Sequence, residues 1–317
     1  MSKLINLFVD VDTGIDDALA LFYLAFAQKN GHIELLGSST VGGNVDVEQT
    51  TLNTLKIWEM LGLDVPVAKG AVKPLEGSLN TAQFVHGDDG LGNTFLSKSK
   101  KLPSEESAVE MILRLSHEYS RDLTILTTAP LTNLAEAILK DSSLSQRIKK
   151  LVIMGGGVYI GNVSPVAEAN IANDPEAARI VFRSGIDITM VGLDVTHKVY
   201  FEDRDLFALK KVNNNRSLFL LKIISFISDA YEKLTGWNRC VLHDPLAAGV
   251  CIFPDLVKSE LSFVDVELKG ELTRGMTVVD RRERKTFGDE NVKVTVEVQA
   301  ERFKKMLMES LIDWANS

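Results

Sequence analysis

Short runs of β-branched and apolar residues alternate along this chain with longer segments whose apolar residues recur at helical spacing. Such alternation is typical of parallel strands joined by crossover helices. It predicts strands over residues 4–10, 33–40, 123–127, 151–154 and 186–191. It predicts helices over residues 16–28, 47–61, 107–118, 131–139 and 175–183. We therefore expect an α/β fold with an open, mainly parallel, Rossmann-like sheet and flanking helices.

The pattern changes beyond residue 200. There the sequence predicts a helix over 217–234, a turn at Trp237, a helix that begins at His243, strands over 264–268 and 292–298, and a final helix over 301–314. Neither a Pro-, Gly- or Ser-rich linker nor an internal repeat divides the sequence,. We expect one domain over residues 1–317, with a helical insertion at about residues 200–240.

The charge balance constrains possible partners. The chain has 43 acidic and 35 basic residues, which gives a formal net charge of −8. Because a nucleic-acid carrier needs basic side chains to neutralise phosphates, we expect no nucleic-acid partner. The one basic cluster, interpreted as a solvated loop or strand end, is interrupted by Glu283 and comprises Arg281, Arg282, Arg284 and Lys285,.

Cysteine usage and hydropathy bear on the compartment. The two cysteines, Cys240 and Cys251, lie in apolar context and are expected to be buried and reduced,. The first ten residues contain too short an apolar run for a signal peptide,. The sequence also lacks the uncharged stretch of roughly 18 residues that would span a membrane. These features predict a cytoplasmic protein without a membrane partner.

Acidic residues crowd the end of the first predicted strand, where ligands of an open parallel sheet bind. Asp10 and Asp12 share one face, and Gly14 allows a turn that returns Asp16 and Asp17 toward them,. Four converging carboxylates would repel one another unless a cation joined them. An all-oxygen donor set favours Ca²⁺ or Mg²⁺ over zinc. A simpler alternative stays open for either Asp16 or Asp17: one of them only stabilises the positive end of the helix that begins there.

The residues at the end of the first predicted strand also resemble a motif of phosphatases. Asp10-Val-Asp12-Thr13 has the form of the nucleophile loop of haloacid-dehalogenase-like phosphatases, in which Asp10 would be the nucleophile and Asp12 its acid. Such enzymes need a second aspartate at a set spacing after a late Gly/Ser-Asp pair, and Gly288-Asp289 lacks it. The phosphatase stays a minor alternative.

A second resemblance extends from residue 4 to about residue 315. Asp10-Val-Asp12-Thr-Gly14-Ile-Asp16-Asp17-Ala18 resembles the amino-terminal signature of the ribonucleoside hydrolases, the inosine-uridine-preferring nucleoside hydrolase family. Further blocks follow in that family's order: Thr40 to Asn44, His86 to Gly92, Thr128 to Asn133, Met154 to Gly157, Gly161-Asn162, Ala167 to Asn170, Asp174 to Ala178 and His243-Asp244-Pro245. A single Asp-x-Asp pair would be a weak signal, whereas ordered blocks along the whole chain are a strong one.

The resemblance implies the nucleoside hydrolase fold and a complete site. One Ca²⁺ per chain would be bound by Asp12, Asp17, Asp244 and the backbone carbonyl of Thr128. Asp12 would also act as general base toward the attacking water, and Asp10 would support the ligands from behind. The ribose oxygens would be held by Asp16, Asn44, Asn162, Glu168 and Asn170. His243 would be the general acid, and His86 would line the base pocket. The family's habit suggests a homodimer or homotetramer.

These residue types suit the cleavage of an N-glycosidic bond. The sugar passes through an oxocarbenium-like state, which anionic groups stabilise while a general base activates water. Amides and carboxylates match the hydrogen-bonding needs of ribose hydroxyls. The departing base carries negative charge unless it is protonated, and histidine titrates near neutral pH.

Each of these residues also has a purely structural interpretation. Asparagines that follow glycine suit turns, a Glu or Asn can cap a helix, a loop histidine can be incidental, and Asp before Pro can N-cap. These alternatives apply to Asn44, Asn162, Glu168, Asn170, His86 and Asp244.

Two positions depart from the family pattern. Thr13 stands where the family often has proline, which affects loop stiffness,. Ala169 stands where the family usually has an aromatic residue against the sugar or base, so stacking is lost unless Tyr159, Phe84 or Trp237 replaces it,. The base preference therefore stays open.

The leading hypothesis is Ca²⁺-dependent hydrolysis of a small-molecule ribonucleoside, purine or pyrimidine, to ribose and free base by direct attack of water with inversion. The rival is a catalytically silent nucleoside or ribose binder. Asp12 and His243 argue against the rival, since a binder needs neither a base nor an acid.

Overall fold

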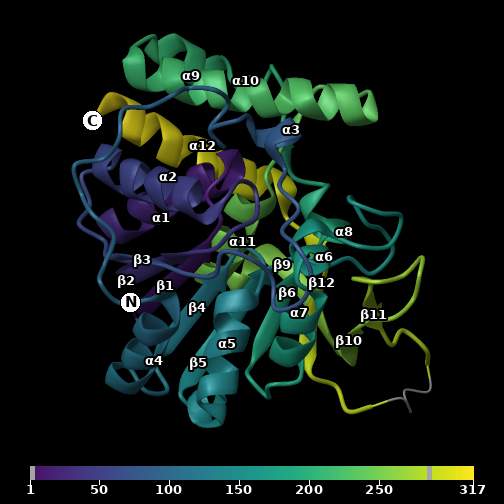
Figure 1. The fold of residues 1–317 in the computed structure, drawn as a ribbon. Helices are drawn as coiled ribbons and strands as arrows, with labels where there is room; N and C mark the ends of the chain where they lie inside the picture. Colours follow the sequence, from purple (N-terminus) through teal and green to yellow (C-terminus); the bar gives the residue numbers. More distant parts are fainter. Residues whose placement is uncertain (1–3, 284–287) are drawn as a thin grey trace.

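The computed structural model describes residues 4–283 and 288–317, so Arg284 and Lys285 of the basic cluster lie outside the described residues. An eight-stranded sheet forms its centre, in the order β3-β2-β1-β4-β5-β6-β12-β9 (Figure 1). Neighbouring strands are parallel except for β9, which pairs antiparallel with β12. The predicted α/β fold with an open, mainly parallel sheet is confirmed.

Six of the eight strands lie within a few residues of their predicted positions. They are β1 (Ile5–Val11), β2 (Ile33–Thr40), β4 (Leu123–Thr127), β5 (Ile148–Met154), β6 (Ile188–Val191) and β12 (Val292–Val298). The sequence did not predict β3 (Val67–Lys69), which has three residues, or β9 (Val257–Ser262), a largely exposed edge strand with charged residues. The predicted strand at 264–268 is β10 (Val264–Val266), which leaves the main sheet and pairs with β11 (Thr277–Val279).

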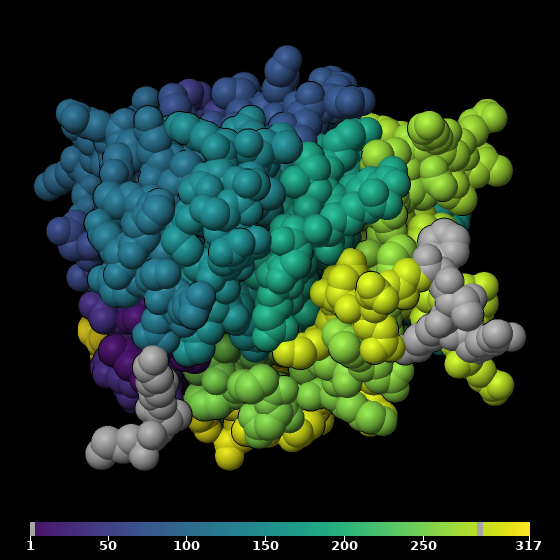
Figure 2. Space-filling view, turned by 90° about the horizontal axis from the view of Figure 1, so that it is seen from below, coloured from purple at the N-terminus to yellow at the C-terminus, as the bar shows by residue number. Residues whose placement is uncertain are grey.

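Helices cover both faces of the sheet, because alternate residues of the buried strands point to opposite sides. Leu7 and Val9 of β1 join one apolar core, and Phe8 joins the other. The first core is closed by α1 (Ile15–Lys29), α2 (Val47–Met60), α11 (His243–Ile252) and α12 (Ala300–Asn316). The second is closed by α4 (Ala108–Glu118), α5 (Thr132–Lys140) and α7 (Pro175–Phe182), whose teal segments cover much of the face in Figure 2.

The region of the predicted insertion contains α9 (Phe207–Val212) and α10 (Asn215–Thr235). α10 packs on α12 and reaches the short α3 (Gln83–His86) (Figure 1). The remaining short elements are α6 (Ala169–Asn173), α8 (Leu193–Thr196), β7 (Tyr200–Phe201), β8 (Cys240–Val241) and two 3₁₀ turns, Ser142–Gln146 and Pro254–Leu256. Cys240 and Cys251 are buried and unbridged, as predicted. Across the described ranges, the helices are too short or too polar to cross a bilayer.

The order of the strands reverses between β1 and β4, which places a crevice beyond their carboxyl ends,. Asp10 and Thr127 are register partners at the ends of these strands. α11 lies against α1 and β5, so its first turn enters the same edge of the sheet. The topology therefore brings the acidic start of α1 and the His243-Asp244 pair to one place.

The packing of α11 leads to a stability prediction. A Cβ added to Gly249 of α11 would lie 2.4 Å from Cε2 of the buried Phe303 ring on α12. We expect Gly249→Ala to lower the free energy of unfolding by about 1–3 kcal/mol, because overpacking outweighs the gain in helix propensity. Urea denaturation measures the change. In a double-mutant cycle, Phe303→Leu should relieve part of the clash; strictly additive effects would contradict the prediction.

Candidate active site

A cavity of about 400 Å³ opens at the crevice. Nine of the predicted site residues line it: Asp16, Asn44, His86, Thr128, Asn162, Glu168, Asn170, His243 and Asp244. Asp12 and Asp17 are 2% and 0% exposed, and they lie behind this lining. The structure thus gathers residues from six separate segments of the chain around one hollow.

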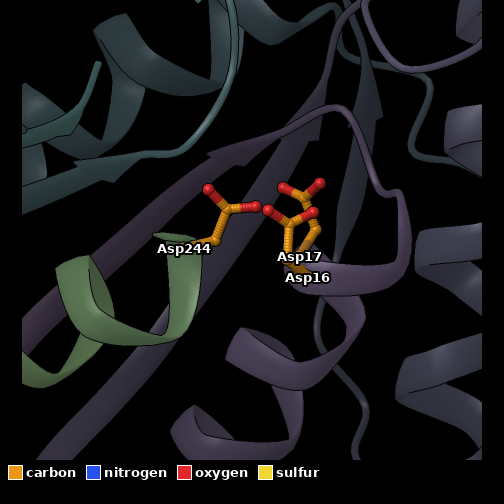
Figure 3. Close-up of side chains that lie close together, drawn as sticks. All are labelled: Asp16, Asp17 and Asp244. Carbon is orange, nitrogen blue, oxygen red and sulfur yellow. The ribbon is translucent and has the colours of Figure 1, made fainter. Parts of the chain in front are cut away.

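Three carboxylates meet at its floor. Asp16 and Asp17 lie in the first turn of α1, and Asp244 reaches them from the first turn of α11 (Figure 3). One ligand oxygen from each lies within 4.8 Å of the others. The N-cap interpretation of Asp244 is wrong, because Leu242 holds the N-cap position and Asp244 lies in the first turn of α11, where its carboxylate is close to those of Asp16 and Asp17.

Asp12 and Asp17 are oriented by the loop that follows β2. Asn44 donates from its backbone N–H to Oδ2 of Asp12 (2.7 Å) and from Nδ2 to Oδ2 of Asp17 (3.0 Å). The Thr128 hydroxyl donates to Oδ1 of Asp17 (2.7 Å). Gly43 is required here, because a Cβ on it would lie 1.9 Å from Oδ2 of Asp12. The loop therefore clamps Asp12 and Asp17, two of the three carboxylates that the sequence predicts as metal ligands; of these two, Asp17 belongs to the close group with Asp16 and Asp244.

The cluster is short of positive charge. Burial raises the pKa values of Asp16 and Asp17 to about 6, and those of Asp12 and Asp244 are raised well above the ordinary value,. Oδ1 of Asp12 and Oδ1 of Asp16 are buried without a hydrogen-bond partner. Unpartnered carboxylate oxygens in a dry, acidic pocket fit a hard divalent cation. Asp16 thus joins the carboxylates that could hold the ion, beside its predicted role toward ribose.

Asp10 does not converge with the others as the sequence predicted. Its Oδ1 accepts hydrogen bonds from the Ser39 hydroxyl (2.5 Å) and from Nδ2 of Asn133 (2.8 Å), and burial raises its pKa to about 6. The Asp10 carbonyl accepts from the Thr128 N–H (3.0 Å), which ties β1 to the end of β4. Asp10 is 1% exposed, and Ser39 and Asn133 hold its Oδ1, an arrangement typical of a supporting carboxylate rather than of the nucleophile that the phosphatase interpretation needs.

The predicted ribose-binding residues on the far wall are held by the backbone. Glu168 is the N-cap of α6: its carboxylate accepts from the N–H groups of Gly156 (2.9 Å), Asn170 (2.9 Å) and Ile171 (3.1 Å). Oδ1 of Asn162 accepts from the Ala169 N–H (2.9 Å). Glu168 therefore caps a helix, as the structural interpretation predicted, but the capped helix is α6 and not α7. Capping and cavity lining coexist in this residue.

Asn170 links this wall to the floor. Its Nδ2 donates to the backbone carbonyls of Thr128 (2.9 Å) and Met154 (3.1 Å). The Thr128 carbonyl is the predicted fourth ligand of the ion. Its position is therefore set by the same side chain that is predicted to contact ribose.

His86 has a defined structural partner. Its Nδ1 accepts from the Ile15 N–H at the start of α1 (3.1 Å), so the ring proton sits on Nε2,. Burial lowers the pKa of His86 to about 4. The neutral His86 ring thus accepts a hydrogen bond from the first turn of α1 and also lines the cavity.

His243 belongs to a hydrogen-bonded set that the sequence did not predict. Its Nε2 is hydrogen-bonded to the Tyr231 hydroxyl (2.7 Å) on α10, and its Nδ1 to the Thr196 hydroxyl (2.7 Å) on α8. Burial, and then His197, His86 and Arg239, hold the pKa of His243 well below its ordinary value. This environment therefore favours the neutral form of His243,. Tyr231 and His197 also line the cavity.

One aromatic candidate lines the same cavity as Ala169. Phe84 of α3 lines the cavity and is 67% exposed, so it stands at the mouth. Tyr159 instead lies under Arg281 in another hollow, and Trp237 contacts Arg239. Of the three aromatic candidates, Phe84 is the one that lines this cavity.

Comparisons with known proteins agree with this geometry. The family profile described as inosine-uridine preferring nucleoside hydrolase matches residues 7–305. The chain belongs to this family. Uridine nucleosidase 1 of Arabidopsis thaliana is 41% identical over 279 residues, which cover 87% of this chain and 82% of that protein. The inosine-uridine preferring nucleoside hydrolase of Leishmania major is 40% identical, with 87% and 88% covered.

The fold agrees as well. A purine-preferring ribonucleoside hydrolase from Gardnerella vaginalis superimposes with a TM-score of 0.91 at 35% identity, over 98% of this chain and 99% of that one. As a nucleoside hydrolase, the chain is an N-glycosidase that acts on ribonucleosides. The cavity with its aspartate cluster is the candidate active site.

Cation dependence can be tested without activity. We expect a divalent cation to raise the melting temperature, because it binds the folded carboxylate cluster; at 100 times its Kd the gain is about 2.7 kcal/mol. Thermal melts with and without a chelator measure this. Asp244→Asn should remove most of the response, whereas Asp255→Asn, at an exposed site that pairs with Arg302, should keep it. A melting temperature indifferent to cations would refute the assignment.

Proposed function

We propose that this chain hydrolyses ribonucleosides to ribose and free base in a Ca²⁺-dependent reaction, by direct attack of water with inversion. The observation that carries the proposal is the two-sided cavity. An oxygen cluster from α1 and α11 forms one side, and the Tyr231-His243 pair forms another. Such a cavity matches a sugar that gains positive charge and a base that gains negative charge.

The cation would be held by Asp12, Asp17, Asp244 and the Thr128 carbonyl, with Asp16 close to them. Ca²⁺ accommodates six to eight oxygen ligands, which suits a donor set without nitrogen or sulfur. When bound, the ion would lower the pKa of the attacking water. One ion per chain is expected, since the described residues contain this one cluster of potential ligands.

Side chains of this protein then provide the general base and the hydrogen bonds to the sugar. Asp12 accepts the proton of the attacking water at Oδ1, the oxygen left unpartnered by the Asn44 loop,. Attack on the face opposite the departing base inverts the anomeric carbon. Five side chains around the cavity hold the ribose hydroxyls: Asp16, Asn44, Asn162, Glu168 and Asn170.

The leaving base receives a proton through the hydrogen-bonded His243–Tyr231 pair. The hydrogen bond between the two side chains stabilises the group that has lost its proton, and solvent returns that proton after the base is released. His86 and Phe84, which line the same cavity, would face the base. The relatives differ in the substrates that they are named for: the plant protein is a uridine nucleosidase and the Gardnerella protein a purine-preferring ribonucleoside hydrolase. We infer acceptance of both classes, because Ala169 leaves room beside Phe84.

The role of Asp12 is tested by an isosteric change. We expect Asp12→Asn to lower kcat for inosine and uridine by a factor of about 10² to 10⁴, because the amide cannot accept the water's proton. A reducing-sugar assay measures this loss, and circular dichroism checks the fold. Asp46→Asn, an exposed cap of α2, is the control and should not alter kcat. Near-normal turnover by Asp12→Asn would reject its role as base, and an inactive wild type would favour a silent binder.

Leaving-group dependence tests the acid. His243→Ala should lower kcat strongly for inosine and uridine, whose bases leave poorly as anions. It should lower kcat little for 4-nitrophenyl riboside, whose leaving group needs no proton. Steady-state kinetics on both substrate types measure the ratio. Equal losses on the two substrates would remove the general-acid assignment.

A further inference from the structure

Thr196 is the residue behind His243, on the side away from Tyr231. It ends α8 and is fully buried, with an exposed fraction of 0%. Within the described residues, Nδ1 of His243 is the one hydrogen-bond partner of its hydroxyl, at 2.7 Å. The two residues are 47 positions apart in the chain, so their contact is created by the packing of α8 against α11.

The proton arrangement follows from this pairing. If Nδ1 of His243 carried the hydrogen, it would donate to Thr196, and the buried Thr196 hydroxyl hydrogen would have no acceptor. Leaving a buried donor unpaired is costly, whereas donation from Thr196 to an unprotonated Nδ1 satisfies both groups. The hydrogen of the neutral imidazole then sits on Nε2 and is donated to the Tyr231 oxygen. The Tyr231 hydroxyl hydrogen is consequently free to point into the cavity.

We propose that Thr196 is a positioning residue that holds His243 in the Nε2–H form, so that the donor chain runs from Thr196 through His243 to Tyr231 and ends at the leaving base. This inference rests on the proposed function. In the step, the Tyr231 O–H bond breaks as a base N–H bond forms. The tyrosinate oxygen keeps the hydrogen bond from His243 Nε2–H until a solvent proton restores it, so atoms and charge balance.

The direct test is spectroscopic. In the Ca²⁺-loaded enzyme with ¹⁵N-labelled histidine, five ring systems are present, and the His243 signals are those missing from His243→Ala. We expect a protonated Nε2 and an unprotonated Nδ1 in the wild type and in Thr196→Ser. Thr196→Val, which has the shape without the hydroxyl, should lose this arrangement. A wild type protonated at Nδ1, or an unchanged pattern in Thr196→Val, would overturn the proposal.

Kinetics provide the second readout. Thr196→Val should lower kcat for inosine and uridine by about 10–100-fold, a typical cost for losing the hydrogen bond that orients a functional histidine. The KM and the turnover of 4-nitrophenyl riboside should change little, and Thr196→Ser should restore most of kcat. Equal losses on nucleosides and the aryl riboside would indicate a merely structural role and overturn the inference.

A matched control and a reference variant separate the possible failures. Thr295→Val removes another buried hydroxyl, which donates to the Met190 carbonyl (3.0 Å) outside the cavity, and should lower the melting temperature without altering kcat. If His243→Ala shows the leaving-group effect and Thr196→Val does not, the Thr196 inference alone fails. If His243→Ala also shows none, the acid assignment of the proposed function fails.

Discussion

The burial of several carboxylates at one edge of the sheet is the constraint on which the rest of the site depends. Among the described residues, none of Asp12, Asp16, Asp17 and Asp244 has a lysine or arginine partner. Their partial compensation comes from backbone N–H groups, hydroxyls and the positive end of α1,. That compensation orients the oxygens but leaves two of them unpaired. This carboxylate cluster could therefore hold a metal ion,.

The side of the cavity predicted to face the nucleobase differs from the carboxylate side in its charge. Its polar groups are neutral, and they are joined through hydrogen bonds from Thr196 to Tyr231 rather than through charges. Burial makes a cationic His243 costly, so directed hydrogen-bond donation takes the place of a resident positive charge,. His86 lies where the two sides meet, with its Nδ1 3.8 Å from Oδ1 of Asp16. Each side stays available for the half of the substrate on which its complementary charge develops.

The sequence predicted what depends on local pattern. The central strands were visible because burial on both faces makes them continuous apolar runs, and the aspartates of β1 and α1 were visible because they are close in sequence. β9 was hidden by its edge position, where Lys258 and Glu260 interrupt any apolar run. The role of Tyr231 was not predicted, because the residue fits the apolar spacing of an amphipathic helix and needs no further explanation there. Its hydrogen bond to His243 forms only when α10 packs against the rest of the fold. Long-range hydrogen bonds of this kind leave no periodic trace.

The two halves of the cavity also differ in how firmly the fold holds them. The sugar side is built from strand ends and from side chains such as Glu168 and Asn170, which are locked onto backbone groups of the central sheet. The base side takes Phe84 and Tyr231 from α3 and α10, which pack outside the sheet layers. Changes in those helices can reshape the base pocket without disturbing the carboxylate cluster. The residues predicted to bind ribose are therefore tied to the architecture, whereas those predicted to face the base stand on helices that can vary within it.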